Sequence, residues 1–220
     1  MSEKDLMLMG EFFDYVSRDY EQVHTSHIDR GEEYYVAFSS PVVPTTLPVT
    51  ALDIGCGSGL ELAEFFRKMP NAQVDCVDLS KKLMEKLVSR YASQKITPHL
   101  ESYLTYAYPR KGYNYIMASA TLHHLVDEEK LMLYRKLREA LTDEGCLIIG
   151  DYFVSEQEAD ERLQQYQQAI ASGVDLSSGK YHFDVPTTVD NEKRLLAAAG
   201  FAPVEAIWES ANYAIISAWG

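Results

Sequence analysis

Cysteine is scarce in this chain of 220 residues, which has only Cys56, Cys76 and Cys146 and no CxxC pair. Because an odd number leaves one thiol unpaired, the pattern excludes a disulfide framework and is typical of a reducing compartment. Long apolar runs are also missing, and none approaches the roughly 18–20 residues of a membrane span. Residues 1–5 lack the basic start and apolar core of a signal peptide. We therefore expect a cytoplasmic protein without a membrane partner.

Basic residues are outnumbered, with 20 Lys and Arg against 33 Asp and Glu, so the net charge is −13 with neutral histidines. Because phosphate binding needs clustered Lys and Arg, this balance disfavours nucleic acid as a partner. Hydrophobic residues make up 46% of the chain, which is enough for a buried core and excludes global disorder. The length suits one α/β domain, and we expect a monomer or a homodimer.

The first 48 residues differ in pattern from the rest. Residues 3–38 are predicted to be helical, because apolar residues such as Leu8, Phe12, Tyr15 and Val16 recur at helical spacing. Prolines follow at positions 41, 44 and 48, and each disfavours helix at the residue before it. The sequence therefore predicts an N-terminal helical cap over residues 1–48 that ends in an extended linker.

From Val49 onward, short apolar runs alternate with helical patterns. Strands are predicted at Val49–Ile54, Gln73–Leu79, Ile96–Leu100, Tyr113–Ser119, Cys146–Asp151, Phe201–Trp208 and Asn212–Trp219. Helices are predicted at Leu60–Lys68, Lys81–Ala92, Glu128–Leu141, Glu156–Ser172 and Val189–Ala199. This alternation indicates an α/β fold with a parallel sheet between two layers of helices. Residues 143–145 read as a turn.

Two segments break the alternation. The last two predicted strands are separated only by residues 209–211, which favours an antiparallel C-terminal hairpin. Residues 152–186, a Gln- and Glu-rich helix followed by a loop, read as an insert in the main domain of residues 49–220.

The strongest local signal is the segment from Asp53 to Gly59, between a predicted strand and a predicted helix. Gly55, Gly57 and Gly59 permit positive φ and let a ligand lie against bare backbone, although a tight turn alone would also use glycines. The spacing is G-x-G-x-G, and Leu60 stands where a dinucleotide fingerprint has Gly or Ala. Because the Asp53 carboxylate would crowd a pyrophosphate, the site suits a ligand with an ammonium or sulfonium charge.

Asp78 ends the second predicted strand, 19 residues after Gly59. This is close to the roughly 20-residue offset at which an acid binds the ribose hydroxyls of a nucleotide. An acid in this place can also cap the next helix, but Ser80 is already placed for that role. We therefore favour ribose binding for Asp78.

These features resemble class I S-adenosylmethionine-dependent methyltransferases of the small-molecule type. The first motif of that family is similar to residues 53–59, its fourth-strand motif to residues 113–116 and 122–125, and its fifth-strand pattern to residues 141–151. The family's closing "ll..aGF" motif is similar to residues 195–201. The resemblance implies a Rossmann-like, doubly wound three-layer sandwich whose seven-stranded sheet is mostly parallel and has an antiparallel last strand.

The resemblance also implies a binding site for S-adenosyl-L-methionine. Its residues would be Asp53, Gly55, Cys56, Gly57, Gly59, Asp78, Leu79, Glu101, Ser102, Ala118 and Ser119. The family usually has an Asp after the third strand, near the adenine, but this chain offers Glu101 or Ser102 instead. Asn114 replaces the family's usual Asp at the fourth strand, a difference that is more often structural than catalytic.

A sulfonium methyl donor needs little help with its leaving group, so catalysis would come mainly from alignment in a dry site. His123 and His124 follow the fourth strand and are candidates for a base or an orienting group, or for a packing role. Tyr20 is expected, by the resemblance, to fold over the donor methyl group, with His24 or His27 close by. Asp151 and Tyr152, at the end of the fifth predicted strand, are candidates for substrate contact, and Tyr181 and His182 in the insert are weaker ones. No His or Cys spacing indicates a metal site, so none is predicted.

Three functions compete at this point. The first is direct in-line methyl transfer to a small-molecule acceptor that the cap and the insert would enclose. The second is a non-catalytic regulatory protein that binds S-adenosylmethionine or S-adenosylhomocysteine. The third is a nicotinamide-dependent oxidoreductase, which Leu60 and Asp53 disfavour.

Overall fold

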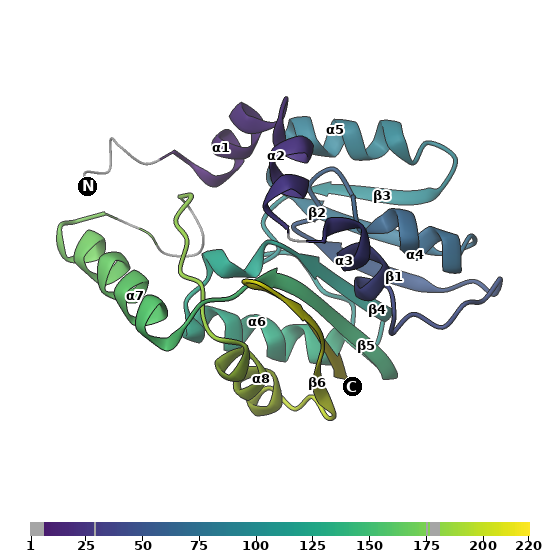
Figure 1. Cartoon of the computed structure of the whole chain (residues 1–220). Helices are drawn as coiled ribbons and strands as arrows, with labels where there is room; N and C mark the ends of the chain where they lie inside the picture. Colours follow the sequence, from purple (N-terminus) through teal and green to yellow (C-terminus); the bar gives the residue numbers. More distant parts are fainter. Residues whose placement is uncertain (1–6, 29, 175, 177–180) are drawn as a thin grey trace.

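The computed structural model describes residues 7–28, 30–174, 176 and 181–220. Within them, seven strands form one sheet in the order β3-β2-β1-β4-β5-β7-β6 (Figure 1). The strands are β1 (Thr50–Ile54), β2 (Gln73–Asp78), β3 (Lys95–Leu100), β4 (Tyr113–Ser119), β5 (Leu141–Tyr152), β6 (Val204–Ser210) and β7 (Tyr213–Trp219). Only β7 runs antiparallel to its neighbours, β5 and β6. This arrangement confirms the predicted mostly parallel sheet and its C-terminal hairpin.

Helices cover both faces of the sheet. They are α1 (Met9–Val16), α2 (Tyr20–His27), α3 (Gly31–Phe38), α4 (Leu62–Lys68), α5 (Lys81–Arg90), α6 (Asp127–Ala140), α7 (Glu156–Ala171) and α8 (Val189–Ala198), with a single 3₁₀ turn at Leu122–His124. Apolar side chains of α3, α4 and α5 pack on one face of the sheet, and those of α6 and α8 pack on the other. Alternate residues of each strand supply the two cores, which is why the central strands are apolar on both sides.

Side-chain caps fix several helix starts where the sequence places Ser or Thr. The Ser80 hydroxyl accepts the backbone N–H of Leu83 at the start of α5. Thr188 does the same for Asn191 in α8, and Ser155 does so in α7. These caps explain why the predicted helix starts agree closely with the structure.

Two local predictions are wrong. Residues 143–145 are not a turn before the fifth strand, because β5 already begins at Leu141, which is fully buried and pairs with Tyr113. The next pair joins Tyr115 to Cys146, so these residues bulge out within the strand. The hairpin link is also shorter than predicted, because Ser210 pairs with Tyr213. Only residues 211–212 connect the two strands, and Ala211 has a φ of 49° there.

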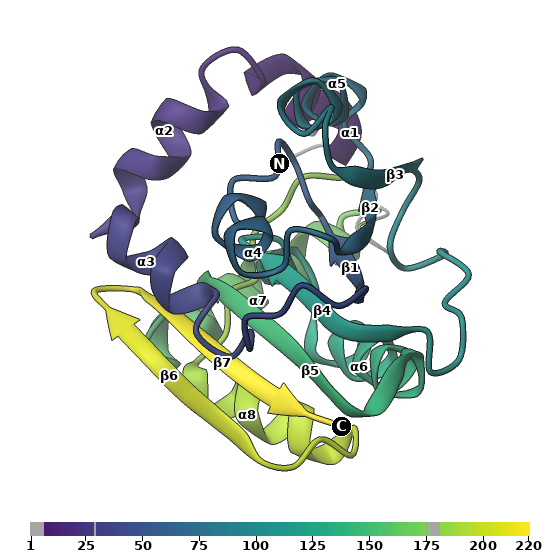
Figure 2. The ribbon, with the colours of Figure 1, turned by 90° about the vertical axis from the view of Figure 1, so that its right-hand side faces the viewer.

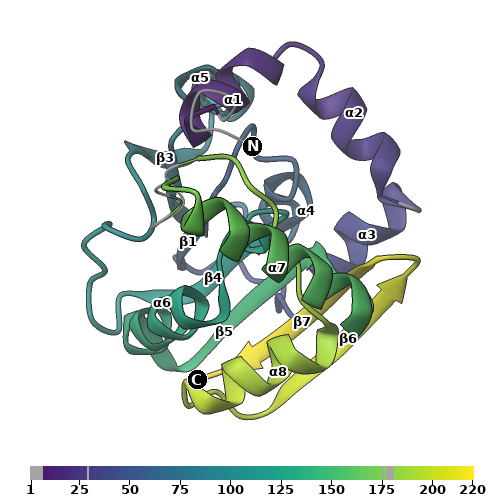
Figure 3. The same cartoon turned by 90° about the vertical axis from the view of Figure 1, so that its left-hand side faces the viewer.

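The N-terminal residues form three short helices, which follow one another in an arc from α5 toward β6 (Figure 2). Asp14 of α1 accepts hydrogen bonds from the Ser80 hydroxyl (2.7 Å) and the Lys82 backbone N–H (2.9 Å). The helix α7 lies in front of the sheet in the view of Figure 3, on the side of α6 and α8. The loop after α7 returns to the cap, because Leu8 bridges to Tyr181. The cap and the insert therefore meet each other.

All three cysteines are buried and free. No helix in the described part of the chain combines the length and the apolar character needed to cross a membrane.

Candidate functional site

The glycine loop follows β1 and has the backbone shape that its sequence predicts. Gly55, Gly57 and Gly59 have φ values of 64°, 48° and 72°. A Cβ atom on Gly55 would lie 2.1 Å from Oγ1 of Thr121, so no other residue fits there without displacing that side chain. The loop therefore brings β1 close to the segment that follows β4, and Gly55 lines a narrow chamber at this place.

Two carboxyl groups lie close together beneath this loop. Asp53 is fully buried and Glu61 is 5% exposed. Apart from the neighbouring Glu61, neither carboxyl oxygen of Asp53 has a polar partner among the described residues. Burial and the Glu61 carboxylate raise the pKa of Asp53 well above its usual range. A positive group bound nearby would relieve this repulsion, so the loop fits a cationic ligand.

Asp78 stands at the carboxyl end of β2 beside the same loop. Its Oδ2 atom accepts the backbone N–H of Gly57 (2.8 Å), and its Oδ1 atom accepts that of Ser80 (2.7 Å). These bonds fix the carboxylate and leave further lone pairs on both oxygens. Burial raises its pKa, although the backbone hydrogen bonds oppose this shift. The Asp78 carboxylate is therefore oriented to accept hydroxyl groups.

A narrow chamber of about 40 Å³ adjoins Asp78. Gly55, Leu79 and Ser102 line it on the side of the sheet. Met9 and Phe13 of α1 line it on the side of the cap. This volume has room for only a few water molecules, so α1 fills most of the space next to the candidate ribose-binding carboxylate.

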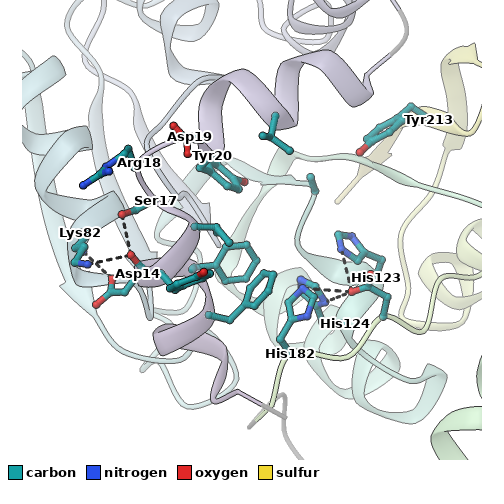
Figure 4. A pocket seen from close by; sticks show the side chains of 17 residues that line it. Asp14, Ser17, Arg18, Asp19, Tyr20, Lys82, His123, His124, His182 and Tyr213 are labelled. Atoms are coloured by element: carbon teal, nitrogen blue, oxygen red, sulfur yellow. Dashed lines mark hydrogen bonds and ion pairs between the residues drawn. The ribbon is translucent and has the colours of Figure 1, made fainter. Parts of the chain in front are cut away.

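A much larger cavity of about 960 Å³ lies between α1, α2, the end of β4 and the insert loop (Figure 4). Its wall includes Tyr20, His123, His124, His182 and Tyr213. A Cβ atom on Gly57 would lie 3.8 Å from Cε1 of Tyr20, so this ring covers the glycine loop. The cavity and the loop are thus adjacent.

His123 is oriented by a buried carboxylate. Its Nδ1 atom lies 2.6 Å from Oδ1 of Asp151, which is 2% exposed. The other Asp151 oxygen accepts the backbone N–H groups of Leu122 and His123. Burial lowers the pKa of His123, but the Asp151 charge and hydrogen bond outweigh it and give a raised value. The second ring nitrogen remains for contact with a ligand.

His124 and His182 lie close to the same part of the cavity, around Asp184. The Oδ1 atom of Asp184 is 3.0 Å from Nδ1 of His124, 3.7 Å from Nε2 of His182 and 3.8 Å from Nε2 of His123. Burial and the neighbouring His123 lower the pKa of His124 to about 4. The His182 ring stacks on Phe12 of the cap, with centroids 3.6 Å apart. One carboxylate oxygen thus lies among three imidazole rings.

The structure brings many of the predicted site residues together. Asp53, Gly55, Gly57, Asp78 and Ser102 lie around the glycine loop and the narrow chamber. Cys56 and Gly59 are buried in the same loop, and Leu79 lines the narrow chamber beside it. Tyr20, His123 and His124 line the large cavity.

Three other predicted residues lie apart from these cavities. Ala118 is fully buried in the core beneath α6. Ser119 is hydrogen-bonded through its hydroxyl to Tyr34 (3.0 Å). Glu101 is exposed and lines none of the cavities found among the described residues. The side chains of His24 and His27 lie outside the described part of the structure.

The sequence did not predict Asp184 as a site residue. Its carboxylate lies between His182, His123 and His124 and brings these three side chains into one cluster. No spacing signals this group, because about 60 residues separate Asp184 from His124 in the chain. Only the return of the insert loop brings them together, where the Val185 N–H donates to the His123 carbonyl (2.7 Å).

Comparison with known proteins agrees with this architecture. Residues 52–147 match a family model described as a methyltransferase domain. An uncharacterized methyltransferase of Mycobacterium bovis is 30% identical over 116 residues, which are 53% of this chain and 56% of that protein. A malonyl-(acyl-carrier protein) O-methyltransferase of Halalkalibacterium halodurans is 32% identical over 109 residues, 48% of this chain and 40% of that protein. The chain spans about half the length of the curated relatives it matches.

Among solved structures, human N-acetylserotonin methyltransferase in complex with S-adenosylmethionine is similar in fold. The TM-score is 0.59 at 17% identity, and the match covers 86% of this chain and 50% of that one. Sheet order, glycine loop and the acid after β2 together define a Rossmann-like methyltransferase fold. Residues 52–147 thus match a methyltransferase domain, and the sheet that contains them has the fold of class I S-adenosylmethionine-dependent methyltransferases.

Proposed function

We propose that this protein transfers a methyl group from S-adenosylmethionine to a small-molecule acceptor. One observation carries the proposal: the buried Asp53 carboxyl beside Glu61, the Asp78 carboxylate and a cavity of about 960 Å³ lie together around the glycine loop. The loop and the two acids suit a cationic nucleoside, and the cavity has room for an acceptor beside it. The match of residues 52–147 to a methyltransferase domain supports the reaction class.

The donor would lie along the carboxyl edge of β1 and β2. Asp78 would accept its ribose hydroxyls, and the charge of Asp53 with Glu61 would favour its positive groups. Ser102 and Leu79 line the chamber on the nucleoside side of Asp78. S-adenosylmethionine supplies an electrophilic methyl group on a sulfonium sulfur, so the chain itself must mainly bind, align and exclude water.

The acceptor would occupy the large cavity. Asp151 accepts a hydrogen bond from the Nδ1–H of His123, which leaves Nε2 to accept a proton from an acceptor O–H or N–H group. Tyr20 covers the glycine loop, and aromatic faces attract sulfonium cations. Catalysis would then come mostly from proximity, with His123 as the base where the acceptor must lose a proton.

A small acceptor fits both the charge and the shape of the protein. The net charge of −13 repels polyanions such as nucleic acids. The wall formed by α1, α2 and the insert loop makes this site a half-open cavity rather than a flat groove. The Halalkalibacterium relative is named for an acceptor joined to a carrier protein, whereas the proposal here needs only the small group that enters the cavity.

Isothermal titration calorimetry with S-adenosylmethionine and S-adenosylhomocysteine tests the donor site. Asp78→Ala should weaken binding about 10- to 100-fold, because a carboxylate contributes charge-assisted hydrogen bonds. Asp75→Ala is the matched control: Asp75 lies on the same strand but pairs with His99 and Tyr113, away from the loop. The proposal fails if the wild-type chain binds neither compound or if Asp78→Ala binds both as the wild type does.

A labelled-methyl assay over a panel of small hydroxyl, amine, thiol and carboxylate acceptors then tests turnover. Transfer to any member that Tyr20→Ala or His123→Ala diminishes supports the enzyme. Tight donor binding with no transfer to any acceptor would favour the alternative, a regulatory protein that binds the nucleoside without catalysis.

A further inference from the structure

We propose that His123, His124 and Asp184 form a binding site for one divalent transition-metal ion in the wall of the large cavity. The two histidines come from the 3₁₀ turn after β4, and the carboxylate comes from the insert loop. One potential ligand atom from each residue lies within 4.8 Å of those of the other two. Figure 4 shows the imidazoles of His123, His124 and His182 gathered at one place in the cavity.

The distances suit a metal centre. A nitrogen or oxygen ligand lies about 2.0–2.2 Å from a zinc-like ion, so neighbouring ligand atoms lie roughly 3–3.5 Å apart. Oδ1 of Asp184 is 3.0 Å from Nδ1 of His124 and 3.8 Å from Nε2 of His123. Small side-chain rotations would therefore place all three atoms around one ion. His182, with Nε2 at 3.7 Å from the same oxygen, lies where a fourth ligand would.

Two buried atoms of this cluster, Nδ1 of His124 and Oδ1 of Asp184, approach each other to 3.0 Å and have no hydrogen-bond partner outside the cluster among the described residues. His124 is 7% exposed, and its other ring nitrogen makes no hydrogen bond to any of those residues either. Buried polar atoms normally have partners. A bound ion would satisfy the His124 nitrogen and the Asp184 oxygen at once.

The surroundings orient His123 as they would a metal ligand. Its Nδ1–H donates to Oδ1 of Asp151 at 2.6 Å, and this bond directs Nε2 toward the Asp184 oxygen at 3.8 Å. A lone pair and a carboxylate oxygen repel each other unless a proton or a metal ion lies between them, and a metal ion at this place would satisfy both atoms. Metal-bound histidines commonly donate their other N–H to a carboxylate in this manner.

The insert loop is also anchored at the same place. The backbone N–H of Val185 donates to the carbonyl of His123, and that of His182 donates to the carbonyl of Met7. These bonds fix the residues on either side of Asp184. The carboxylate is thus tied to both the 3₁₀ turn and the cap, which preorganises the ligand set.

The donor set indicates the kind of ion. Two imidazoles and one carboxylate suit Zn²⁺, Fe²⁺ or Co²⁺, whereas Mg²⁺ and Ca²⁺ prefer oxygen alone. Three protein ligands leave open positions, which here would face the cavity and could take an oxygen atom of the acceptor. In the metal-bound protein, His123 would be a ligand rather than the base.

Absorption spectroscopy with Co²⁺ tests the site on the full chain after chelator treatment, with neither methyl donor nor acceptor present. Visible ligand-field bands should appear, saturate at one Co²⁺ per chain and disappear when Zn²⁺ is added. Asp184→Asn and His124→Gln should each weaken Co²⁺ binding by at least about tenfold. Circular dichroism of both variants checks that they fold.

His99→Gln is the matched control, because His99 pairs with Asp75 at 3.1 Å outside the cluster and should leave the titration unchanged. Absence of saturable bands in the wild type, or an unchanged titration in a folded Asp184→Asn variant, would overturn the proposal and identify a metal-free His–Asp cluster. Since no donor is present, this result is independent of the calorimetry that tests the methyltransferase proposal.

Discussion

Two glycines with positive φ, Gly55 in the glycine loop and Gly200 after α8, differ in the space around them. Gly55 needs both a positive φ and room, because Thr121 lies where its Cβ would be. Gly200, in the turn after α8, has a φ of 98°, and no described atom lies within 4 Å of the place that a Cβ would take there. A substitution at Gly200 therefore measures backbone strain alone, whereas one at Gly55 measures backbone strain together with close packing.

We expect Gly55→Ala to lower the free energy of unfolding by about 1–3 kcal/mol more than Gly200→Ala does, because overpacking adds to the strain. Equilibrium denaturation in urea measures both. Gly55→Ala should also weaken S-adenosylhomocysteine binding, since Thr121 must move beside the narrow chamber. Equal losses of stability in the two variants would show that the contact with Thr121 has no cost.

Helices α6 and α8 are joined by a charged pair inside the core. Lys130 is 2% exposed, and its Nζ atom lies 2.6 Å from Oε2 of Glu192, which is fully buried. The hydroxyl of Tyr134 donates to the other Glu192 oxygen. Burial and the Glu192 charge raise the pKa of Tyr134 well above its usual range, so it remains a donor at all ordinary pH values. The pair thus fixes how the two helices meet.

Removing one partner should be costly because the other charge stays buried. Glu192→Gln is expected to destabilise the fold by about 3–5 kcal/mol, measured by urea denaturation. The exposed pair of Lys111 and Asp143 provides the comparison, and Asp143→Asn should leave the stability almost unchanged because solvent screens this pair. A small effect of Glu192→Gln would mean that water reaches the Lys130 ammonium.

The attachment of α1 to α5 depends on Asp14. Burial opposes its charge, but hydrogen bonds from Lys82 and Ser80 together with nearby lysines lower its pKa below the ordinary 3.8. A depressed pKa means that the stabilisation is present above the ordinary value and is lost as the pH falls through the lowered value. Docking of α1 should therefore weaken only in acid, below about pH 3.8.

Amide hydrogen exchange tests whether Asp14 holds α1 against α5. At neutral pH, Asp14→Asn should speed amide exchange in residues 9–16 relative to the wild type, while β4 and β5 exchange as before. The difference between the two proteins should shrink as the pH falls below the pKa of Asp14. A difference that persists in acid would mean that the amide substitution disturbs α1 by another route.

At the scale of the whole molecule, local patterns predicted the sheet well. The strand β4 and the starts of α5 and α8 follow from apolar runs and from Ser or Thr caps that act within a few residues. The glycine loop and Asp78 could also be predicted, since a strand end and a fixed offset place them. The Asp184 cluster could not, because nothing in residues 152–186 encodes where the insert loop returns. The bulge at residues 142–145 could not be predicted either, because it depends on a long-range pairing, that of Leu141 with Tyr113.

The arrangement of cap and sheet implies that the donor enters by moving α1. Phe13 and Met9 reduce the space next to Asp78 to about 40 Å³, which is far too small for a nucleoside. Among the described residues, few hydrogen bonds attach α1 to the body, chiefly those of Asp14. Outward displacement of this helix is thus the smallest change that opens the chamber, and such a step slows association.

Phe13→Ala should therefore raise the association rate constant of S-adenosylhomocysteine by roughly tenfold or more, as measured by stopped-flow tyrosine fluorescence. The neighbouring Phe12 stacks on His182 and lines the large cavity rather than the chamber, so Phe12→Ala should change the rate little. The dissociation rate should rise as well, because the same ring would cover the bound nucleoside. If both variants accelerate association equally, general loosening of the cap explains the effect. If neither does, the donor enters without displacing α1, through the large cavity that lies against the glycine loop.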